Sequence, residues 1–406
     1  MDDFPEPSTG ELPLAGLRVI DTATILAAPL AATLLGDFGA EVLKIEQPGR
    51  GDPLRDMGGS KDDIPLWWKL YARNKRSVTL DLRTAAGQDV MRTLVRDADV
   101  LVENFRPGTM ERWGLGWEQL HELNPDLTVL RVSGFGRTGK YSTKPGFGTL
   151  CEGMSGFAML NGAADGPPTV PPIAVGDSIA GLYGVIGVLL ALIARSKSRA
   201  RGQCVDVSLL DAVFSIIGYQ CVEFDQLGTI MKRTGNRSPS SVPRNIYQTR
   251  DGKWITVSSS TNAVALRVLR MVGGDALATD ARYSTAESRA RNADDVDRIV
   301  AAWLSERDLG EALSLFEQHD AAAAPAYDIE QIFAEEQFAA TGSILSVADE
   351  DLGALRMPNI LPRLSETPGH VRYAGRRLGQ DTLEVLRRDT TLSEDQIAEL
   401  QRLGVV

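Results

Sequence analysis

The chain has 406 residues, of which 43% are hydrophobic and 24% charged, as is typical of a soluble globular protein with two or three domains. Its formal net charge of −11 argues against general binding to nucleic acid or to an anionic membrane, because both would repel it. The three cysteines form no CxxC pair and the three histidines show no metal-ligand spacing, so we expect a cytoplasmic protein with reduced thiols and no bound metal.

Strand and helix patterns alternate through the first half of the chain. Short β-branched or apolar runs predict strands at Gly16–Ala23, Glu41–Glu46, Ser77–Leu82, Asp99–Phe105 and Leu127–Phe135. The helical patterns between them predict βαβ units, and therefore an α/β fold with a doubly wound, mostly parallel sheet. Ligands of such sheets bind at the carboxyl ends of the strands, which directs attention to residues 104–108 after one strand and residues 134–136 after another.

A long uncharged run, Ile179–Ala194, follows the lone acid Asp177. Its sixteen residues fall short of the roughly 20 that a bilayer requires. Short side chains at Ala180, Gly181 and Gly184 suit close packing against other elements. The sequence therefore predicts a buried helix of a soluble enzyme.

The second half changes character after about residue 225. A polar stretch at 228–245 precedes a predicted hairpin with its turn at Asp251-Gly252, and an amphipathic helix is predicted around Glu394–Leu403. We predict a large α/β domain over 1–225, a small α+β domain over 226–325, and a segment over 326–406 that returns to the large domain.

Common phosphate and nucleophile motifs are missing from the sequence. It contains no GxGxxG before a helix, no GxxxxGK[ST] loop and no GxSxG elbow, so neither a nucleotide-cradling loop nor a serine hydrolase is supported. Basic residues gather in the first third of the chain, from Arg73 to Lys144. Composition alone favours a solvated charged face over a ligand site for these residues.

Asp177 has two interpretations. An aspartate at a helix start accepts backbone N–H bonds and lies at the positive end of the helix dipole, and both effects keep it ionised and able to act as a nucleophile. Aspartate is also a common helix cap with no chemistry of its own. The residues alone favour the cap.

Six sequence blocks, in order, resemble the family III CoA-transferases over nearly the whole chain, the group that includes formyl-CoA transferase and carnitine CoA-transferase. The blocks are L-x-G-x-R-V-I-D (Leu14–Asp21), G-D-F-G-A-E-V-L-K-I-E-x-P-G (Gly36–Gly49), R-N-K-R-S-V-T-L-D-L (Arg73–Leu82), L-V-E-N-F-R-P-G (Leu101–Gly108), G-D-S-x-A-G (Gly176–Gly181) and R-G-Q-x-V-D-V-S-L-L-D-A (Arg201–Ala212).

The resemblance implies that Asp177 is a catalytic nucleophile. CoA would move from an acyl-CoA thioester to a free carboxylic acid through an aspartyl anhydride and an aspartyl-CoA thioester. Coenzyme A would be a substrate, with no tightly bound cofactor. The resemblance also implies a homodimer whose two chains are interlinked.

The same resemblance assigns CoA contacts. The implied positions are Leu80, Arg83, Asn104, Phe105, Arg106 and Arg112, and the basic residues Lys140 and Lys144 are added as candidates for the phosphates. The family often has arginine where this chain has Gln47, so a charge contact there is lost or relocated.

Two alternative functions stay open at this point. The α-methylacyl-CoA racemases resemble the same blocks but place a histidine in a G-H-D segment, where this chain has Gly146-Phe147-Gly148. Because racemisation needs an acid and a base on opposite faces of the substrate, transferase is favoured. A catalytically idle CoA-ester binding protein is the other alternative. The acyl donor and the acceptor acid do not follow from the sequence.

Overall fold

The computed structural model describes residues 12–198, 200–238 and 240–406. The chain divides into two compact units. The first contains the chain up to Phe157, Val170–Val222 and Gly342–Val406, and the second contains Ala158–Thr169 and Glu223–Thr341.

The second unit is larger than the small domain predicted over 226–325. It extends to Thr341, and it takes in Ala158–Thr169, which hydrogen bonds hold to a later part of the chain. Gly235 donates its N–H to the Gly162 carbonyl at 3.1 Å, and the Arg233 guanidinium donates to the Gly166 carbonyl at 2.9 Å. These contacts join residues more than sixty positions apart, which sequence patterns do not reveal.

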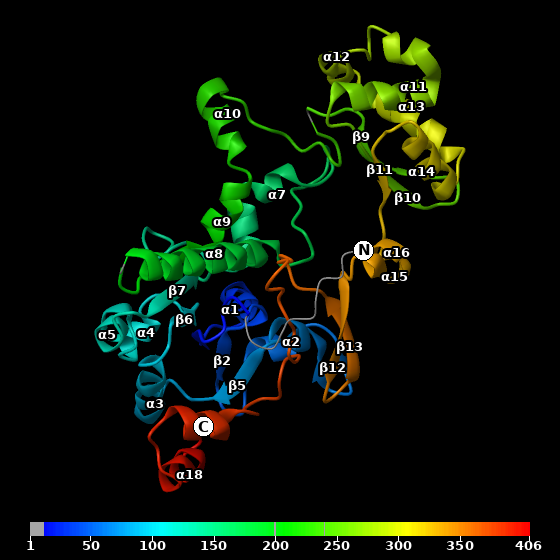
Figure 1. Cartoon of the computed structure of the whole chain (residues 1–406). Helices are drawn as coiled ribbons and strands as arrows, with labels where there is room; N and C mark the ends of the chain where they lie inside the picture. The colour runs from blue at the N-terminus through cyan, green and yellow to red at the C-terminus, as the bar shows by residue number, and fades with distance from the viewer. Residues whose placement is uncertain (1–11, 199, 239) are drawn as a thin grey trace. The chain divides into compact units, whose positions relative to one another are not determined.

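A six-stranded parallel sheet forms the centre of the first unit, as predicted (Figure 1). Its strands are β1 (Arg18–Asp21), β2 (Glu41–Glu46), β5 (Lys75–Thr79), β6 (Val100–Glu103), β7 (Thr128–Ser133) and β8 (Cys204–Ser208). They lie in the order β5-β2-β1-β6-β7-β8, so the direction of winding reverses between β1 and β6. The sequence did not predict β8, which lies at the sheet edge and carries the polar Asp206.

Helices cover both faces of this sheet, and alternate strand residues contribute to the two sides. Ile20 of β1 packs in a core with α3 (Ala85–Val95), α5 (Trp117–Leu123), α17 (Thr382–Asp389) and α18 (Glu394–Arg402). Val19, its neighbour, packs in a core with α1 (Ala27–Asp37), α8 (Val175–Ser198) and α9 (Leu209–Ile216). The predicted C-terminal amphipathic helix is confirmed as α18.

The α8 helix is longer than predicted and is buried on one face only. Its glycines allow close packing: a Cβ at Gly181 would lie 2.7 Å from the Ala27 carbonyl oxygen of α1, and one at Gly184 would lie 3.0 Å from Leu130 of β7. On the other face Leu182, Ile186, Leu190 and Ile193 are exposed. The prediction of a buried helix is therefore wrong for half of its surface. Among the described helices α8 alone is long and apolar enough to cross a membrane.

The second unit is built on a three-stranded antiparallel sheet. Its order is β11 (Ala323–Pro325), β10 (Trp254–Ser258), β9 (Arg244–Gln248). The predicted hairpin is confirmed as β9 and β10, with Gly252 at a φ of 75° in the turn. The helices packed with it are α11 (Asn262–Thr279), α12 (Ala286–Arg291), α13 (Ala293–Ser305) and α14 (Leu309–Gln318).

Shorter elements complete the described chain. They are η1 (Pro53–Asp56), β3 (Ser60–Lys61), β4 (Ile64–Pro65), α2 (Leu66–Tyr71), α4 (Thr109–Arg112), α6 (Gly148–Met154), α7 (Phe157–Leu160), α10 (Tyr219–Leu227), α15 (Ile329–Ala334), α16 (Glu336–Ala340), β12 (Ile344–Asp349) and β13 (Gly353–Pro358).

Candidate active site

The loops after β1 and β6 meet where the winding of the sheet reverses. Asn104, the first residue after β6, accepts the Thr24 N–H at 2.9 Å and donates its side-chain amide to the Thr24 carbonyl at 2.8 Å. The Asn104 side chain thus bonds both backbone groups of Thr24, as a neighbouring strand would, and joins the two loops. The expected ligand-binding edge is therefore preorganised by Asn104.

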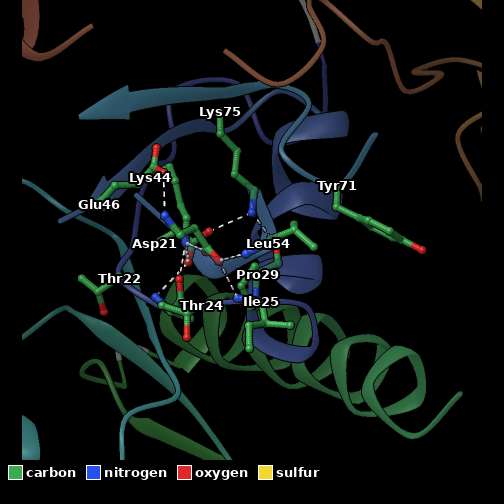
Figure 2. Close-up of polar contacts among 12 residues, drawn as sticks. Asp21, Thr22, Thr24, Ile25, Pro29, Lys44, Glu46, Leu54, Tyr71 and Lys75 are labelled. Atoms are coloured by element: carbon green, nitrogen blue, oxygen red, sulfur yellow. Dashed lines mark hydrogen bonds and ion pairs between the residues drawn. The ribbon is translucent and has the colours of Figure 1, made fainter. Parts of the chain in front are cut away.

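A buried network of charges lies beneath the loop that follows β1 (Figure 2). Lys75 forms an ion pair with Asp21 at 2.7 Å, and Lys44 forms one with Asp52 at 2.8 Å and a longer one with Asp21 at 3.8 Å. Lys44 also donates to the Ala23 carbonyl of the loop. Burial opposes the charge of Lys44, yet Asp21 and Asp52 together raise its pKa above the usual value.

The same network holds Ile25 in an unusual backbone conformation. Ile25 has a φ of 67°, a region that β-branched residues rarely adopt. Its N–H donates to the Asp52 carboxylate at 3.0 Å, and Lys44 in turn holds that carboxylate. Such strain persists only where surrounding contacts fix the backbone, and it concentrates at functional sites.

Asp177 lies in the wall of a cavity of about 610 Å³ that these loops also line. It is the third residue of α8 and lies inside the first helical turn, so the prediction that it caps the helix is wrong. The helix starts at Val175, two residues earlier. A Cβ at Gly148, the first residue of α6, would clash with the Asp177 carboxylate, and this glycine therefore leaves space for that carboxylate.

A second acid, Glu152 of α6, approaches the same helix end. Its side chain is 1% exposed, and its Oε1 accepts the Gly176 N–H at 2.9 Å. Burial and, after it, the charge of Glu152 raise the pKa of Asp177 to about 6. The sequence argument predicted the opposite direction from the helix dipole. Asp177 is still mostly ionised above pH 6, but as an unusually basic carboxylate.

The predicted CoA contacts divide between two cavities. Asn104, Phe105, Arg106 and Lys144 line the larger cavity together with Asp177. A smaller one, of about 250 Å³, is lined by Leu80, Arg83 and Phe105, and by Gln47 at the position where the family often has arginine. Phe105 lines both cavities, and its ring packs edge-on against Trp113 at 5.1 Å between centroids.

Two predicted contacts lie outside both cavities. Arg112 donates to the Thr109 hydroxyl at 2.9 Å and is exposed, and Lys140 lies 5.1 Å from the ring centroid of Tyr141. Arg83 lines the smaller cavity, but its guanidinium is already paired with Asp81 at 2.7 Å. All the CoA contacts stay predictions, and these three also require a side chain to turn toward the ligand.

Sequence reasoning missed Glu152. A signal was present, because Glu152 is the sole charged residue between Lys144 and Asp165. An acid in such a stretch, like Asp177 before its apolar run, is a candidate for a buried functional carboxylate. Within the described ranges no cluster of three or more His, Cys, Asp or Glu side chains could hold a metal ion.

Comparison with known proteins gives matches over nearly the full chain. Residues 14–382 match the family model described as CoA-transferase family III. Succinyl-CoA:D-citramalate CoA-transferase of Chloroflexus aurantiacus is 41% identical over 97% of this chain and 98% of its own. The beta subunit of succinyl-CoA:L-malate CoA-transferase of the same organism is also 41% identical, over 98% of this chain and 99% of its own.

A solved structure with the same fold is a CAIB/BAIF family protein from Brucella suis. It superposes with a TM-score of 0.82 at 28% sequence identity, covering 93% of this chain and 99% of that one.

Proposed function

Since this chain belongs to the family III CoA-transferases, we propose that it moves CoA from succinyl-CoA to a four- or five-carbon dicarboxylic acid, with Asp177 as the nucleophile. The observation that carries this proposal is the larger cavity, where a basic carboxylate lies together with Asn104, Phe105 and two cations.

In the first half of the reaction Asp177 attacks the thioester carbonyl of the acyl-CoA. The C–S bond breaks, the CoA thiolate leaves, and Asp177 becomes part of a mixed anhydride. The thiolate then attacks the Asp177 carbonyl, which releases the first carboxylic acid and leaves an aspartyl-CoA thioester. A carboxylate suits this exchange because its acyl anhydride is about as activated as the thioester, so no ATP is consumed.

The second half reverses these steps with a new acid. The acceptor carboxylate attacks the aspartyl-CoA thioester, the C–S bond breaks, and a second anhydride forms with release of the CoA thiolate. The thiolate, still bound, then attacks the acyl carbonyl of this anhydride, which gives the new acyl-CoA and frees the Asp177 carboxylate. Water must be kept from both intermediates. Leu26, Phe147 and Ile173 in the cavity wall supply apolar surface for that purpose.

The dicarboxylic substrates are inferred from the relatives and from the cavity cations. The relatives named above act between succinyl-CoA and malate or citramalate, both dicarboxylic acids. Arg106 and Lys144 line the cavity that contains Asp177, so one of them can hold the distal carboxylate while the other acid group reacts.

An exchange assay tests the function. Purified enzyme is incubated with succinyl-CoA and, in turn, L-malate, D-citramalate, glutarate and a monocarboxylic acid of equal length, and new acyl-CoA is measured by mass spectrometry. We expect transfer to the dicarboxylates at rates at least about tenfold above the monocarboxylate, since only they engage the second cation. No transfer to any acid would contradict the proposal and leave the idle CoA-ester binding protein.

Racemase is the second candidate, and the site does not favour it. No histidine is among the described residues that line the cavity, and Phe147-Gly148 stands where the racemases have their histidine. The acid and base needed on opposite faces of the α-carbon are therefore not both present.

Arg83→Ala tests the placement of CoA in the smaller cavity. We expect the apparent KM for succinyl-CoA to rise severalfold while the KM for the acceptor acid stays within about twofold. The reason is that the Arg83 side chain would bind the CoA part of the substrate equally strongly in the ground state and in the transition state. Arg96→Ala, which removes an exposed arginine away from both cavities, is the matched control. A fall in kcat alone would move Arg83 to the reacting centre and contradict its assignment.

We also propose that the protein is a homodimer whose chains are interlinked. The exposed stripe Leu182, Ile186, Leu190 and Ile193 repeats at helical spacing along α8, and Phe214 on the next helix is exposed as well. A contiguous apolar face of this length is typical of a protein interface. A second copy of the chain is the occupant that the family resemblance implies.

Subunit exchange distinguishes linked from merely associated chains. Tagged and untagged homodimers mixed for days at native pH should yield no heterodimer, because linked rings cannot separate without unfolding. Joint refolding from denaturant should yield heterodimers. Rapid exchange without denaturant, or a monomeric mass at micromolar concentration, would contradict the interlinked dimer.

A further inference from the structure

Glu152 forms a hydrogen bond to the start of α8, although it takes no part in the transfer steps above. Its Oε1 accepts the N–H of Gly176, the second residue of α8. The first N–H groups of a helix have no partner within the helix, and a side-chain acceptor normally comes from the residue just before it. Here the acceptor comes from α6, twenty-four residues earlier in the chain. The helix end that carries Asp177 is therefore held by a neighbouring helix.

Two glycines make this arrangement possible. A Cβ at Gly176 would lie 3.3 Å from the Gly148 carbonyl oxygen and 3.4 Å from Glu152 Oε1, tighter than side chains ordinarily pack. A Cβ at Gly148 would collide with the Asp177 carboxylate. The close approach of α6 to the start of α8 thus brings the buried Glu152 near the half-buried Asp177.

The hydrogen bond to Gly176 does not explain why residue 152 is charged. A glutamine would accept the same N–H without bringing a second negative charge to the half-buried Asp177 carboxylate. Among the ion pairs of the described residues none involves Glu152 or Asp177. An acid buried without a cation beside another acid is costly, and such costs are tolerated chiefly at functional sites.

The other titratable groups around the pair do not neutralise it. Cys151 of α6 is held as a thiol, because burial and then the charges of Asp177 and Glu152 raise its pKa to about 12. Asp211 of α9 contributes a further negative charge to that thiol. The cations that line the cavity are Arg106, in the loop after β6, and Lys144, in the loop before α6; both are exposed, and neither forms an ion pair with Glu152 or Asp177 in the described chain.

We propose, on the premise of the transfer reaction above, that Glu152 is a positioning residue for Asp177: its hydrogen bond fixes the first turn of α8, and its charge faces the nucleophile in the resting enzyme. Repulsion between the two carboxylates raises the energy of free Asp177. That repulsion ends when Asp177 is acylated, because the anhydride carries no charge at that position. Glu152 therefore favours acylation over the resting carboxylate.

The variants Glu152→Gln and Glu152→Ala separate the two parts of the role. Glu152→Gln keeps the acceptor for Gly176 and removes the charge. In the wild type we expect kcat/KM to fall below about pH 6, where Asp177 becomes protonated. In Glu152→Gln this fall should occur at lower pH. At pH 8 kcat should fall about three- to tenfold, since nucleophilicity falls with basicity. Glu152→Ala also loses the hydrogen bond and should lose about a hundredfold.

A labelling experiment makes the test independent of turnover. Carbodiimide with an amine modifies protonated carboxyl groups, and mass spectrometry follows the modification of Asp177 as a function of pH. The half-maximal pH should be lower in Glu152→Gln than in the wild type, whereas Glu118→Gln, an exposed control with the same charge change, should leave it unchanged.

The outcomes are distinguishable. An unchanged labelling midpoint and an unchanged acidic limb in Glu152→Gln would overturn the electrostatic part, and full activity of Glu152→Ala would overturn the positional part. Failure of the wild type to transfer CoA would contradict the proposed function instead, and the labelling midpoint would still report on Glu152.

Discussion

Asp177→Asn should lose CoA transfer by at least about a thousandfold, because an amide cannot attack the thioester or form the anhydride. The wild type incubated with succinyl-CoA and hydroxylamine should be inactivated, with the hydroxamate located at Asp177 by mass spectrometry. Asp165→Asn, an exposed aspartate of the second unit, is the control and should retain activity. Full activity of Asp177→Asn would contradict the mechanism.

The same variant should be stable, which separates lost chemistry from lost structure. The folded-state pKa of Asp177 is raised from 3.8 to about 6, so the folded protein binds this proton more tightly than the unfolded chain does. Stability therefore falls as pH rises from about 4 to about 6 and stays lower above that window. Asn removes this cost, and thermal unfolding at pH 7 should show a gain of about 1–2 kcal/mol, with little gain at pH 4.

Gly148→Ala should lower kcat about a hundredfold with little change in the KM for acyl-CoA. The added methyl group would occupy the position of the Asp177 carboxylate, which must then rotate away from the substrate. Small displacements of a reacting group cost this much because the reaction depends on orientation.

Gly153→Ala is the matched control for that variant. It lies on the same helix, α6, and a Cβ there would meet no atom within 4 Å. Alanine also has the higher helix propensity, so this variant should be active and slightly stabilised. Equal activity of both alanine variants would contradict the claim that Gly148 makes room for the nucleophile.

Local patterns sufficed for five of the six strands in the sheet of the first unit. Five of its strands are short apolar runs, and a strand buried on both faces, such as Val100–Glu103, has that signature whatever its neighbours are. The edge strand Cys204–Ser208 was missed because it is only partly buried and includes the exposed Asp206. The predicted end of α8 at Ala194 was four residues short, since polar residues near a helix end do not by themselves stop it.

The site was predictable in part. Asp177, Asn104 and Phe105 were all named from the family resemblance, and the structure places them in the lining of one cavity. The Glu152 contact depends on how α6 packs against α8, which no local pattern encodes. The pKa of Asp177 was predicted with the wrong sign for the same reason: burial and Glu152 outweigh the helix dipole, and both arise from tertiary packing.

The charge network beneath the loop that follows β1 limits which substitutions this chain can accept. Lys44, Lys75, Asp21 and Asp52 are all buried, and each has a partner within the set. Loss of Asp21 leaves Lys75, and loss of Lys44 leaves Asp52, without an ion-pair partner in the set, at a cost of about 3–5 kcal/mol, whereas joint replacement by apolar residues need not cost stability. We therefore expect substitution of a single member to be disfavoured. In relatives, the four positions should be either all kept or all replaced together.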